Sequence, residues 1–327
     1  MSGGDAPQGF DEDVFRGVDE LLHRAISFDA SCAVPKIRKE FVNVEYARSL
    51  PACQDRSGDR RDRVDDDRKE TRMIQAIDRA AKILDLLQGA RHLGITDLSS
   101  ALGLPPSTVH GIVKSLRAHG LVAKERGGQR YMLGPTLLRL SNVYLDSLDV
   151  RARSMRWTQE LARRTHLSVR LGAPHFTDVL VIHHNLRPDD SQQMLETGMA
   201  IPAHASAMGK VLLAYDQGFQ RTVFDAPLRS LTGDTVTDVA RLTLELPAIA
   251  ERGMAGEFDE AVLGESSLAA PVADASDAIV AAVAVVLPTS QTPASDAVVN
   301  ALRETARNIS RELGATSWPP RISPADD

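Results

Sequence analysis

The feature that most constrains this chain is the uneven distribution of charge along it. Residues 73–135 hold eight Lys or Arg against four Asp or Glu, whereas residues 136–327 hold seventeen against twenty-four. Residues 1–72 hold thirteen against sixteen. Because the net charge of the whole chain is -6, a surface for nucleic acid must be local to the short basic segment. The pattern predicts a small basic module attached to a larger acidic domain.

The first 72 residues have little capacity to build a core. From Gln54 to Arg72, fourteen of nineteen residues are charged, so no apolar face can form there. One short amphipathic helix is possible over 14–26, which is too little for a domain. We expect residues 1–72 to be a largely disordered extension, with Met73 as a possible internal start of translation. The alternative is a charged tail that modulates partner binding.

Cysteine content and hydropathy exclude several classes of protein. The two cysteines, Cys32 and Cys53, are too few for a disulfide scaffold or a four-ligand zinc site. The longest apolar run, 278–287, has ten residues, whereas a membrane-spanning helix needs about twenty. We therefore expect a cytoplasmic protein with no membrane partner, no cofactor and no metal site.

Residues 73–135 have the pattern of a winged helix-turn-helix. Apolar residues that repeat every three to four positions predict a first helix ending near Gly89. Thr96 is the expected N-cap of a short second helix, which Gly103 ends. A third helix is expected to begin with Pro106 in its first turn. The order and spacing of these helices fit a DNA-binding module.

The polar side of the predicted third helix carries the residues expected to contact DNA. Short hydroxyl side chains near its start suit base edges and phosphates, and cations further along can reach the backbone. Strands at 121–125 and 130–133 are predicted to form the wing, because glycines between them permit a tight hairpin. The expected DNA-binding residues are Thr96, Ser107, Thr108, His110, Gly111, Lys114, Arg117, Arg126 and Arg130.

The rest of the chain predicts a linker helix over 136–149, an α+β sensor domain over 150–316 and a tail over 317–327. The linker is apolar around much of its circumference, so we expect it to pair with a second chain. Two recognition helices in fixed relation require such a dimer. Short connections favour antiparallel strands. The expected strands are 167–172, 179–185, 193–196, 268–272 and 279–287, with helices at 150–165, 206–215 and 294–313.

No set of residues in the sequence predicts catalysis. A nucleophile elbow, a phosphate loop and a dinucleotide fingerprint are all missing from the sequence. His183 and His184 are adjacent on a predicted strand, so they point to opposite faces and cannot share one metal. His175 and His204 are expected to be structural. We expect no enzyme activity; the alternative is a metabolite-processing enzyme with a DNA-binding tether.

The segment 203–210 is the best candidate for binding a small effector. Its small residues would let a ligand approach the amides at the start of a helix, and those amides favour an anion. The alternative is ordinary tight packing.

Several segments resemble the IclR family of bacterial transcriptional regulators. They are MIQAIDRAAKILDLL, ITDLSSALGLPPSTVHGIVKSLRAHGLV and YMLGPTLLRL. In addition, VIHHNLRPDDSQQMLETGMAIPAHASAMGKVLLAY is similar to the glycerol-operon regulator branch. The resemblance implies a winged helix-turn-helix domain joined by a linker helix to a GAF-like α/β effector-binding domain, in dimers or tetramers. Many members have arginine where this chain has Gly111, so their operator sequence cannot be carried over.

The resemblance also implies a DNA-binding transcriptional regulator whose binding to operator DNA is modulated by a small metabolite. The branch suggests glycerol or a glycerol phosphate as that metabolite. Two family positions that can be serine are Ala284 and Val286 in this chain, which predicts a less polar pocket or one in which the backbone supplies most of the polar contacts. The residues implied to bind the effector are Ala207, Met208, Glu257, Asp259, Ser267, Ala284 and Val286.

Overall fold

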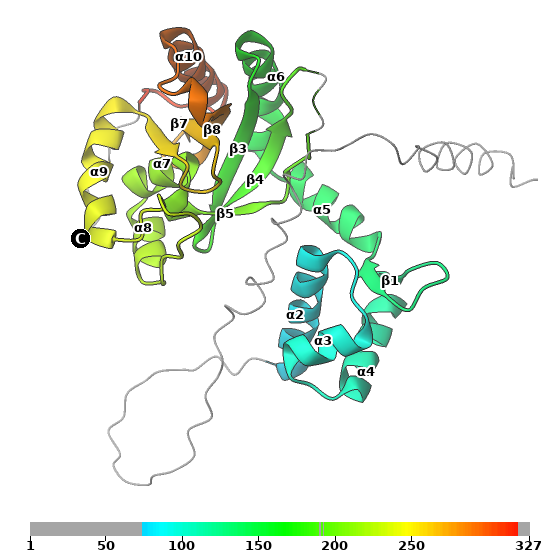
Figure 1. Ribbon diagram of the computed structural model, residues 1–327. Helices are drawn as coiled ribbons and strands as arrows, with labels where there is room; N and C mark the ends of the chain where they lie inside the picture. Colours follow the sequence, from blue (N-terminus) through cyan, green and yellow to red (C-terminus); the bar gives the residue numbers. More distant parts are fainter. Residues whose placement is uncertain (1–73, 190, 192, 320–327) are drawn as a thin grey trace, which may run out of the picture. The chain divides into compact units, whose positions relative to one another are not determined.

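The computed structural model describes residues 74–189, 191 and 193–319 (Figure 1). Its internal contacts divide the described residues into two compact units, with the boundary between Thr136 and Leu137. The expected extension and residues 320–327 of the expected tail lie outside the described residues. Within the described part, no helix is both long and apolar enough to cross a membrane.

The first unit is a three-helix module with a two-stranded hairpin, as the sequence predicted. Ile83, Leu98 and Val109, one from each helix, are fully buried in a common core. The two strands pair antiparallel. The elements are α2 Gln75–Ala90, α3 Ile95–Leu102, α4 Pro106–Ala118, β1 Val122–Lys124 and β2 Tyr131–Leu133.

The start of α3 differs from the prediction that Thr96 is its N-cap. The N-cap is Gly94, whose N–H donates to the Asp97 carboxylate at 2.9 Å. Because the acid three residues after the cap satisfies this amide, the helix begins before Thr96, which lies exposed in the first turn. At the other end, Gly103 has a φ of 62° and ends the helix as expected.

The second unit contains one antiparallel sheet and the remaining helices. Among the described residues the sheet has six strands in the order β5-β4-β3-β8-β7-β6. Its strands are β3 Ser168–His175, β4 Asp178–Asn185, β5 Ala200–Pro202, β6 Ala255–Phe258, β7 Glu265–Ala273 and β8 Ile279–Pro288. The helices are α5 Thr136–Asp146, α6 Asp149–Thr165, η1 Ala203–Ala205, α7 Ala207–Tyr215, α8 Gln217–Phe224, α9 Val239–Arg252, η2 Thr289–Gln291 and α10 Asp296–Glu312.

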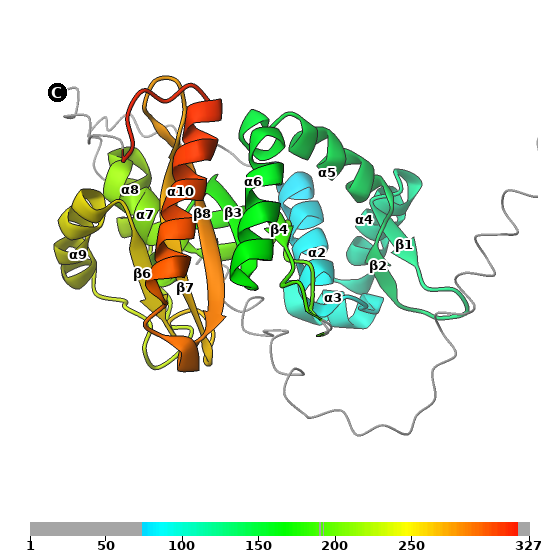
Figure 2. The same cartoon turned by 90° about the horizontal axis from the view of Figure 1, so that it is seen from above.

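Helices cover both faces of this sheet, which gives a three-layer arrangement (Figures 1 and 2). One face packs on α6 and α10 through residues such as Leu171 and Val283. The other packs on α7, α8 and α9 through residues such as Ala282 and Ala284. Neighbouring residues of one strand therefore belong to different layers.

The predicted strand at 193–196 does not form. The edge strand that pairs with β4 is β5, further along the chain. Glu196 lies in irregular structure, and its backbone N–H donates to the ring nitrogen Nδ1 of His184 at 3.0 Å. A side chain thus takes the hydrogen bond that a strand partner would accept. Helices α8 and α9 and strand β6 were not predicted.

Candidate functional site

The polar side of α4 carries no acidic residue. The turn before α4 is fixed by Ser99, whose hydroxyl donates to the carbonyl of Leu104. Pro106 is the first helical residue, so its missing N–H leaves no gap in the helix. The residues that face away from the core are Ser107, His110, Gly111, Lys114 and Arg117, which are exposed, and Thr108, which is half-buried.

The cations near α4 and the wing have no carboxylate partner among the residues that the structure describes. Lys114, Arg126 and Arg130 are exposed and form no ion pair there. On α2, by contrast, Lys82 lies 2.9 Å from Asp78. Free surface cations are the groups that exchange counterions for DNA phosphates, so this side of the unit is suited to that role.

The wing is held close to α4 by contacts at its base. The guanidinium of Arg117 lies 5.9 Å from the centre of the Tyr131 ring, a cation–π distance. Tyr131 also exchanges two backbone hydrogen bonds with Leu93, of 2.8 and 3.0 Å. At the tip, Gly127 has a φ of 76°, which permits the tight turn beside Arg126.

Most of the residues implied to bind an effector lie on the sheet face that α7 covers. Glu257, Ser267 and Val286 stand opposite one another on β6, β7 and β8. Ser168 of β3 continues this row, because it pairs with Val286. Ala284 lies two residues further along β8, on the same face. Together these positions form the floor of a candidate effector site.

The start of α7 lies against this face. A Cβ built on Gly172 of β3 would come within 2.9 Å of the Met208 sulfur, so the two elements are in close contact. Gly209 is equally constrained, since a Cβ there would lie 2.1 Å from the carbonyl oxygen of Ala203. All of residues 203–210 are buried. Tight packing therefore accounts for at least part of the small-residue pattern in this segment.

Glu257 is a buried carboxylic acid at one end of the row. It accepts hydrogen bonds from the Ser267 hydroxyl at 2.8 Å and from the Glu260 N–H at 3.2 Å. Burial raises the pKa of Glu257 to about 7, although the two hydrogen bonds act in the opposite direction and lower it. Near neutral pH the group is therefore partly protonated and can donate as well as accept a hydrogen bond.

Asp259 is not brought together with the other implied effector residues. Its carboxylate accepts from the Gly264 N–H at 2.6 Å and from the Thr289 hydroxyl at 2.7 Å. Asp259 has a φ of 57°, a strained value that the surrounding turn holds in place. The side chain closes the turn between β6 and β7 rather than facing the row.

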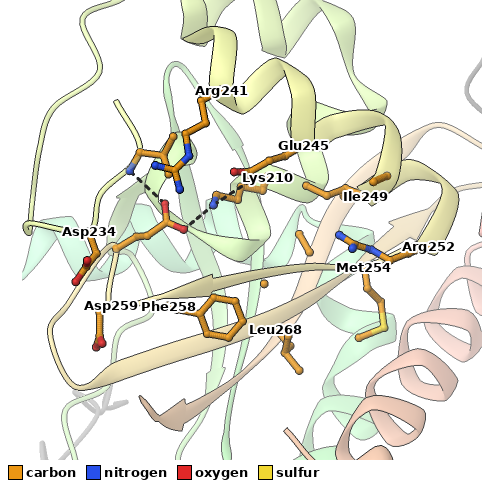
Figure 3. A pocket seen from close by; sticks show the side chains of 15 residues that line it. Lys210, Asp234, Arg241, Glu245, Ile249, Arg252, Met254, Phe258, Asp259 and Leu268 are labelled. Carbon is orange, nitrogen blue, oxygen red and sulfur yellow. Dashed lines mark hydrogen bonds and ion pairs between the residues drawn. The ribbon is translucent and has the colours of Figure 1, made fainter. Parts of the chain in front are cut away.

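A groove of about 790 Å³ lies between α9 and the free edge of β6 (Figure 3). Lys210, only 3% exposed, places its ammonium group 2.5 Å from Glu260 and 3.3 Å from Glu245. This ion pair ties α7 to α9 and compensates a buried charge. Of the implied effector residues, Asp259 is the one that lines the groove. The groove and the polar row are thus different surfaces.

Sequence reasoning missed a polar network beside the row. Arg170 of β3 pairs with Ala284 and is on the α7 face of the sheet. Its guanidinium lies 2.5 Å from Glu196 and 3.6 Å from Glu265. These charged groups lie beside the residues implied to bind the effector. The alternation Ser168, Val169, Arg170, Leu171 contained a signal, because it puts an arginine on one face of a strand whose other face is fully buried.

His183 and His184 face different layers, as the sequence predicted. His184 lies opposite Arg170 and His183 opposite Leu171, so the two rings are on opposite sides of the sheet. Burial is the main cause that lowers the pKa of both. His204 is buried and its ring nitrogen Nε2 lies 2.9 Å from the carbonyl oxygen of Arg229, a structural contact.

Comparisons with known proteins agree with this arrangement. The IclR helix-turn-helix domain matches residues 76–126, and the C-terminal domain of bacterial IclR transcriptional regulators matches residues 142–311. The glycerol operon regulatory protein of Streptomyces griseus is 43% identical over 250 residues, covering 75% of this chain and 98% of that protein. Its counterpart in Streptomyces coelicolor is 41% identical over 249 residues, covering 75% and 98%.

Solved structures show the same fold. An IclR-type regulator from Silicibacter has a TM-score of 0.63 at 26% identity and covers 76% of this chain and 100% of its own. One from Alicyclobacillus acidocaldarius has a TM-score of 0.64 at 25% identity, covering 74% and 100%.

A basic winged helix-turn-helix joined to a sensor domain defines a DNA-binding transcriptional regulator. The family model of the C-terminal domain matches more than half of the chain. The chain belongs to the IclR family.

Proposed function

We propose that this protein regulates a glycerol operon, and that glycerol or a glycerol phosphate modulates its binding to operator DNA. The observation that carries this proposal is the 43% identity to the Streptomyces griseus regulator across 98% of that protein. The proposal includes no catalytic role, because the relatives that match over nearly their whole length are named as regulators. A cytoplasmic location fits this function.

The DNA contacts in this proposal come from α4 and the wing. Ser107, Thr108, His110 and Gly111 approach base edges, while the cations contact phosphates. Thr96, which is exposed in the first turn of α3, contacts the DNA backbone next to the bases that α4 reads. The proposed phosphate contacts are Lys114, Arg117, Arg126 and Arg130.

Two chains act together in this proposal. Leu138, Leu140, Val143 and Tyr144 of α5 are each about half or more exposed within the single chain. Exposed apolar side chains around a helix are stabilised when a second copy covers them, and a dimer places two recognition helices on neighbouring half-sites. A tetramer is compatible with the same helix pairing.

The effector binds in the sensor domain of this protein, and Asp259 holds the adjacent turn. The proposed effector contacts are Ala207, Met208, Glu257, Ser267, Ala284 and Val286. Binding can change the DNA affinity only through a difference in effector affinity between two arrangements of the protein.

The DNA part of the proposal is tested with the full chain and fluorescent duplexes. One duplex is taken from the region upstream of the gene and the other is scrambled. Lys114→Ala should weaken binding to both duplexes similarly and reduce the slope of log affinity against log salt by about one. Lys82→Ala is the matched control, since Lys82 already pairs with Asp78 on α2. An unchanged slope for Lys114→Ala contradicts the proposed contact.

The effector part is tested by footprinting on the upstream region with and without glycerol and glycerol 3-phosphate. Protection that changes with either compound supports the proposal. Protection that neither compound changes contradicts the assigned effector, while leaving the DNA contacts intact.

A further inference from the structure

Arg170 is a nearly buried cation beside the effector floor. Its side chain is 14% exposed, and its partner Glu196 is 19% exposed. Arg170 pairs with Ala284, yet its guanidinium reaches Glu265, which stands opposite Pro288 four residues along β8. The side chain therefore extends along the floor past Val286 toward the β7 edge of the row.

The hydrogen bonds around Arg170 fix which groups remain free to donate. His184 Nδ1 accepts from the Glu196 N–H, so a neutral ring carries its proton on Nε2. Burial lowers the pKa of His184, which favours that neutral form. The Nε2–H then donates to the Ser168 oxygen at 2.7 Å. Within the described residues, the Ser168 hydroxyl hydrogen has no acceptor of its own.

Arg170 itself is only partly engaged. Its Nε donates to Glu196, and its contact with Glu265 is an ion pair at 3.6 Å rather than a hydrogen bond. A guanidinium has five N–H donors in a planar fork, which suits carboxylate and phosphate oxygens. Arg170 and Ser168 thus offer several donors on one face, next to Val286.

We propose that Arg170 binds the anionic group of the effector, a phosphate or carboxylate, and that Glu196 occupies this position until the effector displaces it. This inference rests on the proposed effector response and assigns its specificity to one side chain. An incoming anion replaces one carboxylate with another negative group, so the charge around Arg170 stays nearly balanced. A neutral polyol that displaced Glu196 would leave the charge of Arg170 without a negative partner.

Because the effector must displace Glu196, it binds one conformation of the protein more tightly than the other. Three hydrogen bonds hold Glu196: its carboxylate accepts from Arg170, its N–H donates to His184, and its carbonyl accepts from the Met199 N–H at 2.9 Å. An anion on Arg170 removes the first of these and leaves the two backbone contacts. The irregular stretch from 193 to 199 then has a different set of contacts with and without ligand, which is the difference that regulation requires.

The experiment is isothermal titration calorimetry of the full chain without DNA, using glycerol 3-phosphate and glycerol as probes. Arg170→Met should weaken the binding of glycerol 3-phosphate at least tenfold, because the phosphate loses its charge-assisted hydrogen bonds to the guanidinium. Glu196→Gln should tighten it about tenfold by removing the internal competitor. Neither variant should change the affinity for glycerol by a comparable factor.

The matched control is Glu304→Gln, which alters another carboxylate paired with an arginine, Arg164, at 2.9 Å between α6 and α10. It should leave both titrations unchanged. Should Arg170→Met fail to fold, Glu196→Gln decides alone. The proposal is overturned if Glu196→Gln leaves glycerol 3-phosphate affinity unchanged, if Arg170→Met folds and binds it as the parent does, or if the parent does not bind it.

The proposed function fails separately from this inference. A chain that binds glycerol 3-phosphate through Arg170 but shows no operator footprint fails as a regulator only. A chain whose footprint responds to glycerol 3-phosphate, but whose two variants titrate like the parent, fails only in the role given to Arg170.

Discussion

The two units of this chain use their charged residues in opposite ways. Around α4 and the wing, cations such as Lys114 and Arg130 are exposed and form no ion pair within the described residues. In the sensor domain, Lys210 and Arg170 are nearly buried and lie against carboxylates. Free cations suit a partner that supplies the opposite charge from outside. Paired cations suit a site in which a ligand must compete with a residue of the protein.

The same contrast holds for glycine. Gly209 of α7 is enclosed, with the Ala203 carbonyl oxygen 2.1 Å from a built Cβ, whereas Gly111 of α4 has nothing within 4 Å. A helix that packs on a sheet has no spare room on its inner side. A helix that faces a separate partner keeps its outer side open, so a small residue there is not required by the fold.

The largest expected effect comes from Gly209→Ala. The added methyl group cannot fit against the Ala203 backbone, so α7 must move away from η1. We expect a loss of about 3 kcal/mol in the free energy of unfolding, at the upper end of overpacking effects. Urea unfolding followed by circular dichroism measures it. A loss below the error of that experiment would show that α7 is less tightly packed against η1 than the structure indicates.

The next effect is the pH dependence that Glu257 imposes. Its pKa is about 7 in the folded chain against the ordinary value of 4.5 for a solvated glutamate, so the folded state keeps a proton that the unfolded state loses. Stability therefore falls as pH rises from about 4.5 to about 7. Glu257→Gln removes this dependence and should be more stable than the parent by roughly 2 kcal/mol at about pH 8. Urea midpoints at about pH 5 and about pH 8 test this, on either side of the folded pKa; parallel shifts of both proteins would contradict it.

A smaller effect is expected for His110→Ala on the exposed side of α4. If His110 contacts base edges, its loss should reduce the free-energy difference between operator and scrambled duplex by about 1 kcal/mol. Lys114→Ala should leave that difference nearly unchanged, since phosphates carry no sequence information. Competition binding at one salt concentration distinguishes them. If His110→Ala lowered the affinity for both duplexes equally, His110 would contact the DNA backbone rather than the bases.

The smallest effect is expected for Gly111→Ala. An open helical position gains about 0.5 to 1 kcal/mol when alanine replaces glycine, because the unfolded chain loses freedom. The comparison with Gly209→Ala is sharpest in the same urea titration, where the two changes should have opposite signs. A destabilising Gly111→Ala would mean that α4 has less room than the structure gives it.

Local pattern was enough to predict most of the first unit. Its helices place apolar residues on one side, and α3 ends at Gly103, so each element is decided largely by nearby residues. The wrong prediction of Thr96 as the N-cap of α3 has a local cause as well, because the Asp97 carboxylate accepts from the Gly94 N–H and starts the helix two residues earlier. The alternation on β3 and β4 was equally readable from the sequence.

The sequence by itself determined the order of elements in the first unit, its basic character and the alternation that puts His183 and His184 on opposite faces. Only the tertiary structure decided that Glu257, Ser267 and Val286 form one row and that Arg170 and Glu196 meet beside it. The reason is physical. Periodicity depends on neighbours along the chain, whereas strand register and an ion pair 26 residues apart depend on how distant segments pack.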